Sequence, residues 1–412
     1  MEAKKVLFIG LVWPEPTSSA GGIRTVQLIE LFVAQGAQVY FACAAAKGEF
    51  SFNLQKLGVT EQSIALNDPS FNTFIKELQP DIVIYDKFMI EEQYGWRIQQ
   101  EWPNALTILD TIDLHCLRVG RQLAEKVNAD FSNEHLFNDT AKREIAAILR
   151  CDFSLIISEI EMNILQEQFK IDGNILFYLP LLEDKLKEQT SNTWKTYEER
   201  EGFTFIGNFL HEPNWHTVQT IKTKIWPILS KKLPGVGVHI YGAYASQKVL
   251  QLNNPKENFF IHGRAENARE SIAKHRILLA PIIFGAGVKG KFIDAMQVGT
   301  PSITTHVGAE SMNGTLPWNG FIEDNLDALI EQAVQLYNNK NLWLQAQQNG
   351  IQIINQRYNK QKYSALFLQK LKDLTGNLSN HRYQNFIGQV LKHHTLQSTK
   401  YLSLWIEEKN KS

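Results

Sequence analysis

The sequence predicts an α/β protein with two parallel-sheet domains facing a central cleft. Short apolar runs rich in β-branched and aromatic residues alternate with segments of helical period along most of the 412 residues. The alternation is interrupted between Glu183 and Glu201, where the chain is charged, polar and poor in aliphatic residues. Two alternating sets separated by such a segment fit two α/β units better than one long sheet.

The expected domain boundaries follow from these patterns. Residues 1–185 form the first domain, residues 186–201 the linker and residues 202–355 the second domain, and residues 356–412 form terminal helices. Open parallel sheets bind ligands beyond the carboxyl ends of their strands. The active site is therefore expected in the cleft.

Each strand is expected where a short apolar run is bounded by turn residues. In the first domain these runs are Val6–Ile9, Val39–Ala42, Ile82–Tyr85, Leu106–Leu109, Leu155–Ser158 and Leu176–Tyr178. In the second they are Phe203–Ile206, Val238–Tyr241, Phe259–His262, Ile277–Ala280 and Ser302–Thr304. Helical spacing is present in Arg24–Gln35, Asn138–Leu149, Tyr363–Leu374 and an amphipathic segment from Tyr383 to about Glu408.

Composition and charge argue against several classes of function. The chain is 44% hydrophobic and 21% charged, with a formal net charge of −1 and no basic stripe, so nucleic acid is not an expected partner. Cys43, Cys116 and Cys151 lack metal-ligand spacing and are expected to be reduced thiols of a cytoplasmic protein. The first apolar run is too short for a signal peptide, and no stretch reaches the roughly 18 apolar residues of a membrane span. Peripheral attachment to the inner membrane face stays open.

The most informative segment follows the fourth strand of the second domain. A loop holding Gly285, Gly287 and Gly290 opens onto a helical pattern near Lys291, and Lys289 adds a second positive charge. Glycines let the backbone approach a ligand closely, and a helix N-terminus presents unpaired amides to an anion. The loop therefore predicts a phosphate site, with a tight strand-to-helix turn and solvated lysines as the structural alternative.

Residues 281–310 resemble the donor-binding segment of glycosyltransferases with two Rossmann-like domains, the GT-B fold. The resemblance is strongest to the retaining glycosyltransferase family four (glycosyl transferases group 1). That family has a G-x-G-x-K-x-K-type loop, an acidic residue one helical turn later, an A-M pair, and then G-x-P-x-x-x-T and V-G-A-E. The matching residues here are Gly285, Gly287, Lys289, Lys291, Asp294, Ala295, Met296, Gly299, Pro301, Thr304, Thr305 and Val307–Glu310. The resemblance implies that the second domain binds the nucleotide-sugar donor, that the first binds the acceptor, and that the terminal helices cross back to the first domain.

The resemblance also assigns roles within this loop. The expected donor-binding residues are Gly285, Ala286, Gly287, Val288, Lys289, Lys291 and Asp294, and Lys289 is also expected to act in catalysis. Asp294 occupies the position of a family glutamate that reaches the nucleotide ribose. Many members carry another glutamate eight residues earlier that contacts the sugar hydroxyls, but this chain has Ala286 there. The identity of the sugar and of the base therefore stays open.

Two further segments are similar to parts of the family's donor site. Gly21 and Gly22 lie where the family has an N-terminal glycine loop close to the donor diphosphate, with a surface loop that starts a helix as the alternative. Asn208 and His211 follow the first strand of the second domain, where many relatives use an arginine and a lysine. Asn214 is either a weaker candidate for the same role or a helix-start residue.

The candidate catalytic residues of the first domain follow its fourth strand. His115 corresponds to a family histidine that approaches the transferred sugar and its acceptor, and Asp113 and Arg118 are candidates to orient it. A purely structural histidine is the alternative.

The resemblance implies a metal-independent glycosyltransferase without a cofactor. It would move a sugar from a UDP- or GDP-linked donor to a hydroxyl of a glycan, lipid-linked saccharide or protein, with retention of the anomeric configuration. Backbone amides and ammonium groups suit this chemistry because negative charge grows on the leaving diphosphate. Two other interpretations stay open: a nucleotide-sugar epimerase of the same fold, and a degenerate, non-catalytic protein that binds a nucleotide sugar or a protein partner.

Overall fold

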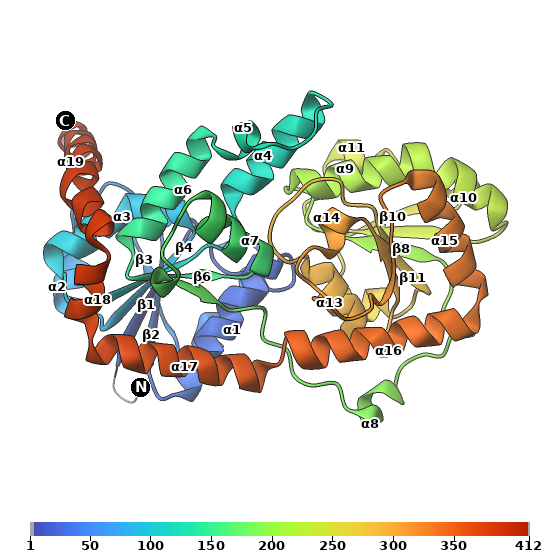
Figure 1. Cartoon of the computed structure of the whole chain (residues 1–412), viewed down its shortest axis with the longest axis horizontal. Helices are drawn as coiled ribbons and strands as arrows, with labels where there is room; N and C mark the ends of the chain where they lie inside the picture. Colours follow the sequence, from blue (N-terminus) through green and yellow to red (C-terminus); the bar gives the residue numbers. More distant parts are fainter. Residues whose placement is uncertain (1–3, 411–412) are drawn as a thin grey trace. The chain divides into compact units, whose positions relative to one another are not determined.

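The computed structural model describes residues 4–410, apart from the side chains of Glu188 and residues 394–398. The chain forms two compact units. The first contains the chain up to Pro16, Gly21–Leu181 and the segment from Lys362 onward; the second contains Thr17–Ala20 and Leu182–Gln361. Each unit is a parallel sheet with helices on both faces (Figure 1), which confirms the predicted α/β architecture.

The sheet of the first unit has seven parallel strands in the order β3-β2-β1-β4-β5-β6-β7. The strands are β1 (Lys5–Gly10), β2 (Gln38–Cys43), β3 (Thr60–Ser63), β4 (Ile82–Asp86), β5 (Leu106–Asp110), β6 (Phe153–Ile156) and β7 (Leu176–Tyr178). The strand order reverses between β1 and β4, which are paired from Val6↔Ile82 to Ile9↔Tyr85. In an open parallel sheet, this reversal leaves a crevice at the carboxyl ends of the strands.

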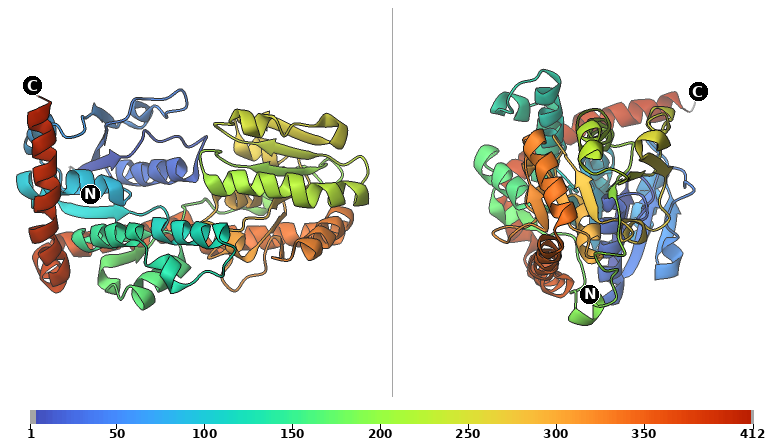
Figure 2. Two further views of the ribbon diagram at one scale, coloured as in Figure 1. Left: turned by 90° about the horizontal axis from the view of Figure 1, so that it is seen from above. Right: turned by 90° about the vertical axis from the view of Figure 1, so that its right-hand side faces the viewer.

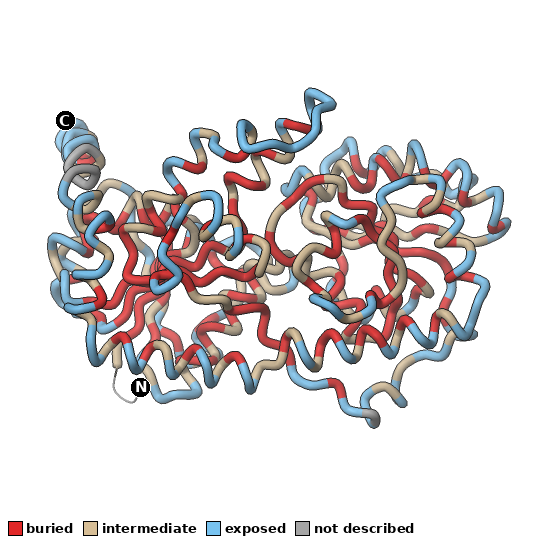
Figure 3. Tube along the Cα trace, viewed as in Figure 1, coloured by how far each residue is buried: buried red, intermediate tan, exposed pale blue. Residues whose placement is uncertain are grey.

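Helices cover this sheet on both sides. They are α1 (Ala20–Ala34), α2 (Ser70–Leu78), α3 (Phe88–Glu101), α4 (His115–Lys126), α5 (Asn133–Leu136), α6 (Asp139–Arg150), α7 (Glu159–Asn163), α17 (Lys360–Gly376), α18 (Leu378–Gln384) and α19 (Phe386–Lys409). The central strands β1, β4, β5 and β6 are almost entirely buried as a result (Figure 3). Phe32 of α1 contacts both Phe8 of β1 and Phe367 of α17, so the two ends of the chain share one core.

Polar contacts anchor the last helices to the first unit. Arg382 of α18 donates to both carboxylate oxygens of the buried Asp152, at 2.7 and 2.8 Å, and to the carbonyls of Pro103 and Ala105. The Nε2 atom of His381 lies 2.6 Å from the Asp152 carbonyl oxygen. α19 then packs across α3 and α6 on the outside of the unit (Figure 2).

The second unit repeats this topology with six parallel strands in the order β10-β9-β8-β11-β12-β13. The strands are β8 (Phe203–Ile206), β9 (Val238–Tyr241), β10 (Phe259–Gly263), β11 (Ile277–Ala280), β12 (Ser302–Thr304) and β13 (Gly320–Ile322). The helices are α8 (Glu188–Ser191), α9 (Glu212–Thr220), α10 (Trp226–Lys232), α11 (Gln247–Leu250), α12 (Ala268–Ile272), α13 (Gly290–Gln297), α14 (His306–Ala309), α15 (Leu326–Asn338) and α16 (Lys340–Arg357). Here the strand order reverses between β8 and β11.

The charged segment before β8 packs partly into the second unit. Arg200 is fully buried and donates to Thr300 Oγ1 at 2.6 Å and to the Val298 carbonyl at 2.7 Å. The hydroxyl of Tyr197 donates to the Tyr337 carbonyl at 2.5 Å. The last residues of the expected linker therefore form part of the second unit, although their composition is that of a linker.

The predicted strands agree with the structure to within two residues, and the differences have local causes. β6 begins and ends two residues earlier than expected. Its end differs because Ser158 is the N-cap of α7, where its side chain accepts from the Glu161 amide. The sequence does not predict β3, a polar strand at the sheet edge, or β13, which has three residues. The amphipathic C-terminal segment is divided at Asn385, whose side chain caps the start of α19.

Three histidines stack on one face of the second sheet. His239 Nδ1 lies 2.9 Å from His262 Nε2, and the His239 ring stacks on the His275 ring with 4.5 Å between centroids. The Tyr241 hydroxyl lies 3.1 Å from His275 Nε2, and the Glu201 carbonyl lies 3.2 Å from His275 Nδ1. Burial, then the charge of His262, lowers the pKa of His239 to about 4. Burial, then the charge of His239, lowers the pKa of His275 to about 3.

The second unit is therefore expected to lose stability in acid. A histidine with a pKa near 6.5 when unfolded and about 3 to 4 when folded binds protons preferentially in the unfolded state. The stability present above about pH 6.5 should then fall as the pH drops toward about 4. Urea unfolding should show a lower midpoint at about pH 5 than at about pH 7.5. His239→Gln, which keeps a hydrogen-bonding side chain but takes up no proton, should reduce this difference; an unchanged difference would contradict the assignment.

Candidate functional site

In the second unit, the reversal of strand order brings two loops together. The loop after β8 begins at Gly207, and the loop after β11 runs from Pro281 into α13. β8 and β11 are neighbours, with Ile277 paired to Phe203. The carboxyl ends of neighbouring parallel strands lie at one edge of the sheet, so residues far apart in the sequence meet there.

The loop between β11 and α13 depends on glycine at two positions. Gly285 has a φ of 156° and Gly287 a φ of 64°, and other residues rarely adopt either value. The hydroxyl of Thr305 donates to the Ile282 carbonyl near the start of the loop. Lys289 is the N-cap residue of α13, and its Nζ donates to the Gly287 carbonyl at 2.9 Å. A glycine loop that leads into a helix N-terminus is an arrangement suited to bind an anion.

Lys291, in the first turn of α13, holds its ammonium group between an amide and an aromatic ring. Nζ donates to Asn214 Oδ1 at 2.6 Å and lies 4.5 Å from the centroid of the Phe205 ring. Burial, and secondly the charge of Lys289, lowers the pKa of Lys291 from 10.5 to about 7. A bound phosphate would favour the charged form, because it would supply a negatively charged partner for this partly buried ammonium.

Asn214 connects the two loops of the site. Its Oδ1 accepts from Lys291, and its Nδ2 donates to the Asn208 carbonyl at 2.8 Å. Gly207 lies against this amide, because a Cβ atom at Gly207 would be 2.6 Å from Asn214 Cγ. His211 lies at the exposed N-cap position of α9. Asn214 is therefore a positioning residue for Lys291 as well as part of the first turn of α9.

Asp294 lies in the same helix as Lys291 and belongs to an ion-pair network. Its Oδ1 accepts from Arg269 Nε at 2.8 Å, and Arg269 Nη2 donates to Glu183 Oε2 at 3.0 Å. Gln297 Nε2 donates to the same Glu183 oxygen at 2.9 Å. Burial raises the pKa of Asp294, and the charge of Arg269 opposes that rise. The network accounts for the burial of Asp294, and its contact with a ribose stays a prediction.

In the first unit, the two candidate glycines lie in the first turn of α1 instead of preceding a helix. A Cβ atom on Gly22 would lie 2.5 Å from the carbonyl carbon of Glu15, so this position requires glycine for packing. A Cβ atom on Gly21 would lie 3.5 Å from Cδ1 of Ile112. Ile112 has a φ of 62°, which is strained for a β-branched residue, and it lies just beyond β5. The diphosphate contact of the glycine pair stays a prediction.

His115 begins α4 and is oriented through Nδ1. This atom lies 3.2 Å from the Asp113 carbonyl oxygen and 3.5 Å from a carboxylate oxygen of both Asp113 and Glu144. Asp113 also forms an ion pair with Arg118. The edge of the imidazole contacts Phe88, with 5.4 Å between ring centroids. These contacts place acceptors at Nδ1, so Nε2 is the nitrogen that a ligand would meet.

Sequence reasoning missed the buried charges that support these positions. Arg24 donates through Nε to both carboxylate oxygens of Asp110, at 2.7 and 3.0 Å, and through Nη1 to the Leu179 carbonyl at 2.7 Å. Glu144 and Glu161, both buried, accept from the backbone amides at the start of α4. Charged residues within amphipathic helices normally face solvent, so the sequence carries no signal for these contacts.

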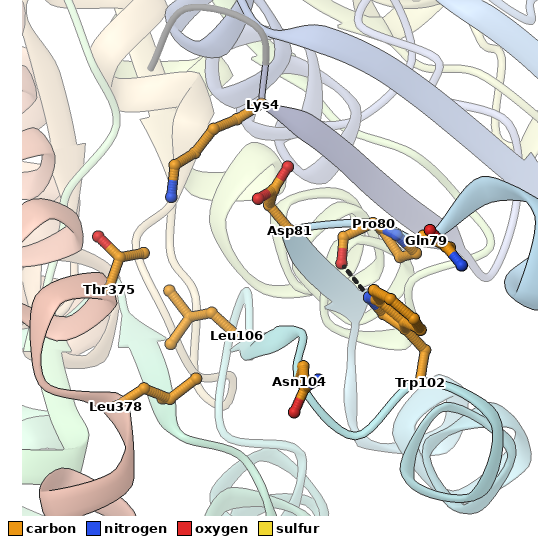
Figure 4. Close-up of a pocket in the computed structure, with 9 residues that line it drawn as sticks. All are labelled: Lys4, Gln79, Pro80, Asp81, Trp102, Asn104, Leu106, Thr375 and Leu378. Carbon is orange, nitrogen blue, oxygen red and sulfur yellow. Dashed lines mark hydrogen bonds between the residues drawn. The ribbon is translucent and has the colours of Figure 1, made fainter.

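The first unit also has a hollow of about 200 Å³ at a different place (Figure 4). It is lined by Lys4, Gln79, Pro80, Asp81, Trp102, Asn104, Leu106, Thr375 and Leu378. The indole of Trp102 donates to the Pro80 carbonyl at 3.0 Å, and Asp81 accepts from the Lys5 amide at 2.8 Å. The hollow lies at the starts of β1, β4 and β5, whereas His115 follows the end of β5. It is therefore not part of the candidate site.

The structure thus brings most of the donor-site candidates of the second unit together at one edge of its sheet. These residues are Asn208, Asn214, Gly285, Ala286, Gly287, Val288, Lys289 and Lys291. His211 and Asp294 lie on the adjoining helices α9 and α13.

Comparison with known proteins gives a family match within the second unit and a fold for the chain. Residues 200–339 match the family Glycosyl transferases group 1. Sucrose-phosphate synthase from Thermosynechococcus elongatus is similar in structure, with a TM-score of 0.68 and 14% identity over 90% of this chain and 100% of that one. A glycosyltransferase from Rickettsia africae has a TM-score of 0.66 and 12% identity, covering 92% of this chain and 100% of that one. HepE from Anabaena, whose structure was solved with UDP, has a TM-score of 0.64 and 13% identity, covering 90% of this chain and 100% of that one.

No curated protein sequence matches the chain. The matched segment runs from just before β8 to the end of α15 and contains the whole loop from Gly285 to Lys291. The solved structures match nearly all of the chain at low identity and therefore establish its fold. The chain thus has the GT-B fold, and its residues 200–339 match the model of the glycosyl transferases group 1 family.

Proposed function

We propose that this protein transfers a sugar from a UDP- or GDP-linked donor to a hydroxyl of a glycan, lipid-linked saccharide or protein. The observation that carries the proposal is the partly buried ammonium of Lys291 at the start of α13, 2.6 Å from Asn214 and next to a glycine loop. An ammonium with a lowered pKa at a helix N-terminus is a site for an anion with several charges, such as a diphosphate.

Known ligands of proteins with this fold support the choice of donor. HepE from Anabaena is described in complex with UDP-glucose, and TarM from S. aureus in complex with UDP. UDP-linked sugars are therefore the first donors to test, followed by GDP-linked sugars.

The proposed chemistry needs no nucleophile from the protein. As the bond between the anomeric carbon and the diphosphate oxygen breaks, negative charge grows on the departing phosphate. Lys289, Lys291 and the amides of Gly285–Val288 would stabilise that charge. The acceptor hydroxyl would attack from the face that the diphosphate leaves, and the diphosphate would assist removal of its proton, which retains the anomeric configuration. These groups would act without a metal ion.

His115 is proposed to meet the transferred sugar and the acceptor through Nε2. Asp113 would hold the imidazole through Nδ1, the arrangement that the 3.2 and 3.5 Å separations support. His115 would then act on the reacting sugar, whereas the second unit would hold the nucleotide.

The function is tested by incubating the intact protein with UDP- and GDP-linked hexoses and a panel of glycan, lipid-linked and peptide acceptors. Release of nucleoside diphosphate together with a sugar-extended acceptor would support the proposal. Conversion of the donor to an isomeric nucleotide sugar without an acceptor would identify an epimerase. Donor binding without either product would identify a non-catalytic binding protein.

Lys291→Ala should weaken the binding of the donor nucleoside diphosphate by about 10- to 100-fold, because a charge-assisted hydrogen bond contributes about 1.5–3 kcal/mol. Calorimetric titration measures this directly. Lys222→Ala is a matched control, because Lys222 also lies over a phenylalanine ring of the second unit, 4.6 Å from the centroid of Phe259. An equal loss in both variants, or no loss in Lys291→Ala, would exclude Lys291 from the site.

His115→Ala should lower kcat about 100-fold or more while leaving the dissociation constant of the nucleotide nearly unchanged, because the residue acts on the reacting sugar. His135→Ala, a histidine substitution elsewhere in the first unit, should leave both quantities unchanged. If His115→Ala weakened nucleotide binding as much as it slowed turnover, its role would be structural.

Asp294→Asn should reduce the preference for a ribonucleotide. If Asp294 accepts hydrogen bonds from ribose, the ratio of dissociation constants for 2′-deoxy-UDP and UDP should fall by about tenfold, since a hydrogen bond to a charged group contributes about 1.5–3 kcal/mol. If Asp294 serves only the network with Arg269, the ratio should stay the same and only the thermal midpoint should fall.

A further inference from the structure

α19 packs against the first unit through polar groups and through one glycine. Arg97 of α3 forms a buried ion pair with Glu407, and Ser403 donates to Asn67 Oδ1 at 2.5 Å. Gly388 approaches α6 so closely that a Cβ atom there would lie 2.1 Å from the Leu149 carbonyl oxygen. These contacts fix which side of the helix faces the protein.

The opposite side of α19 exposes large apolar side chains near both ends of the helix. Its described residues are Phe386, Ile387, Val390, Tyr401, Leu402, Leu404 and Trp405, which we call the outer face. Phe386 is 68% exposed, and Tyr401 and Trp405 are each 61% exposed. At 100° per residue, these three lie within about 100° of one another around the helix, and Gly388, Ser403 and Glu407 lie on the other side.

This orientation is the reverse of that expected for a surface helix. An amphipathic helix normally turns its apolar side to the core and its charged side to water. Here, a buried ion pair holds the polar side inward, even though burial of charges is costly unless they are paired. An exposed patch with several large apolar side chains marks an interaction surface.

We propose that the outer face of α19 binds the headgroup region of an anionic lipid surface. Within the part of the chain that the structure describes, no helix is long and apolar enough to cross a membrane, so α19 would lie along the surface. Tyrosine and tryptophan favour this boundary, because each has an apolar ring and a polar group.

Charge on the helix favours a lipid surface over other occupants. By helical spacing, Lys400 borders the outer face on one side and Lys409 on the other, where Lys409 Nζ lies 5.3 Å from the Trp405 ring centroid. By the same spacing Glu408, which is exposed, lies on the outer face, so this face carries one acid between the two lysines. The other acid of the last turns, Glu407, is paired with Arg97. Lysines that flank an apolar stripe can reach anionic headgroups while the stripe enters the boundary layer. Two copies pairing through this face would instead bring the same lysines close together.

The test is sedimentation of the full chain with vesicles of phosphatidylcholine alone and of equal parts phosphatidylcholine and phosphatidylglycerol. The protein should bind the anionic vesicles preferentially, and added salt should release it. The double variant Tyr401→Ser/Trp405→Ser should reduce the partition coefficient about tenfold or more, because it removes two exposed aromatic rings. Its thermal midpoint should stay unchanged, because both side chains lie outside the core.

A matched control removes exposed apolar side chains elsewhere in the first unit. Val127→Ser/Phe137→Ser should bind vesicles as the wild type does; Val127 is 67% and Phe137 49% exposed. Failure of the wild type to sediment with either vesicle would overturn the proposal, as would equal binding by the Tyr401→Ser/Trp405→Ser variant. Light scattering that shows a dimer converted to a monomer by that variant would instead identify a second copy as the occupant.

Discussion

The candidate site depends on one interaction, the contact of the Lys291 ammonium with the Asn214 amide next to the Phe205 ring. A lysine in water keeps its proton well above neutral pH, but burial here lowers the pKa to about 7. A charged group in such surroundings is unfavourable unless it is paired, and an anionic ligand would supply the partner. The amide oxygen accepts a hydrogen bond from the ammonium, but it carries no net charge and so does not neutralise it. The site therefore favours a negatively charged ligand, which is the property that a site for a nucleoside diphosphate requires.

Topology explains why this contact can exist in the second unit. Asn214 and Lys291 are 77 positions apart, but their loops follow β8 and β11, which are neighbours because the strand order reverses between them. The first unit has the same strand order, and it also gathers functional candidates beyond its strand ends. There, the carboxylates of Glu144 and Glu161 fix the start of α4 that carries His115, and the buried pair of Arg24 and Asp110 joins α1 to the end of β5. Both units thus use buried polar contacts to hold loops at the crevice of a parallel sheet.

The sequence was sufficient to predict most of the strands and the glycine loop before α13, because both leave local signals. Strands such as Ile277–Ala280 are short apolar runs between turn residues, and the loop has a fixed order of glycines and lysines. Contacts between distant residues leave no such signal. The pairing of Asp294 with Arg269 appears only when α12 and α13 are folded side by side. An amphipathic pattern at the C-terminus predicts a helix, but it does not tell which side of α19 faces the protein.

The central claim is tested most directly by measuring the pKa of Lys291 with nuclear magnetic resonance of the lysine side-chain nitrogens. Lys291→Arg would identify the signal, because that signal alone should disappear. In the protein without nucleotide, the signal should titrate near pH 7. Saturating UDP or GDP should move the titration upward by more than about one pH unit, because the diphosphate stabilises the charged form. A signal that titrates near 10.5 without nucleotide, or one that no nucleoside diphosphate displaces, would contradict the account.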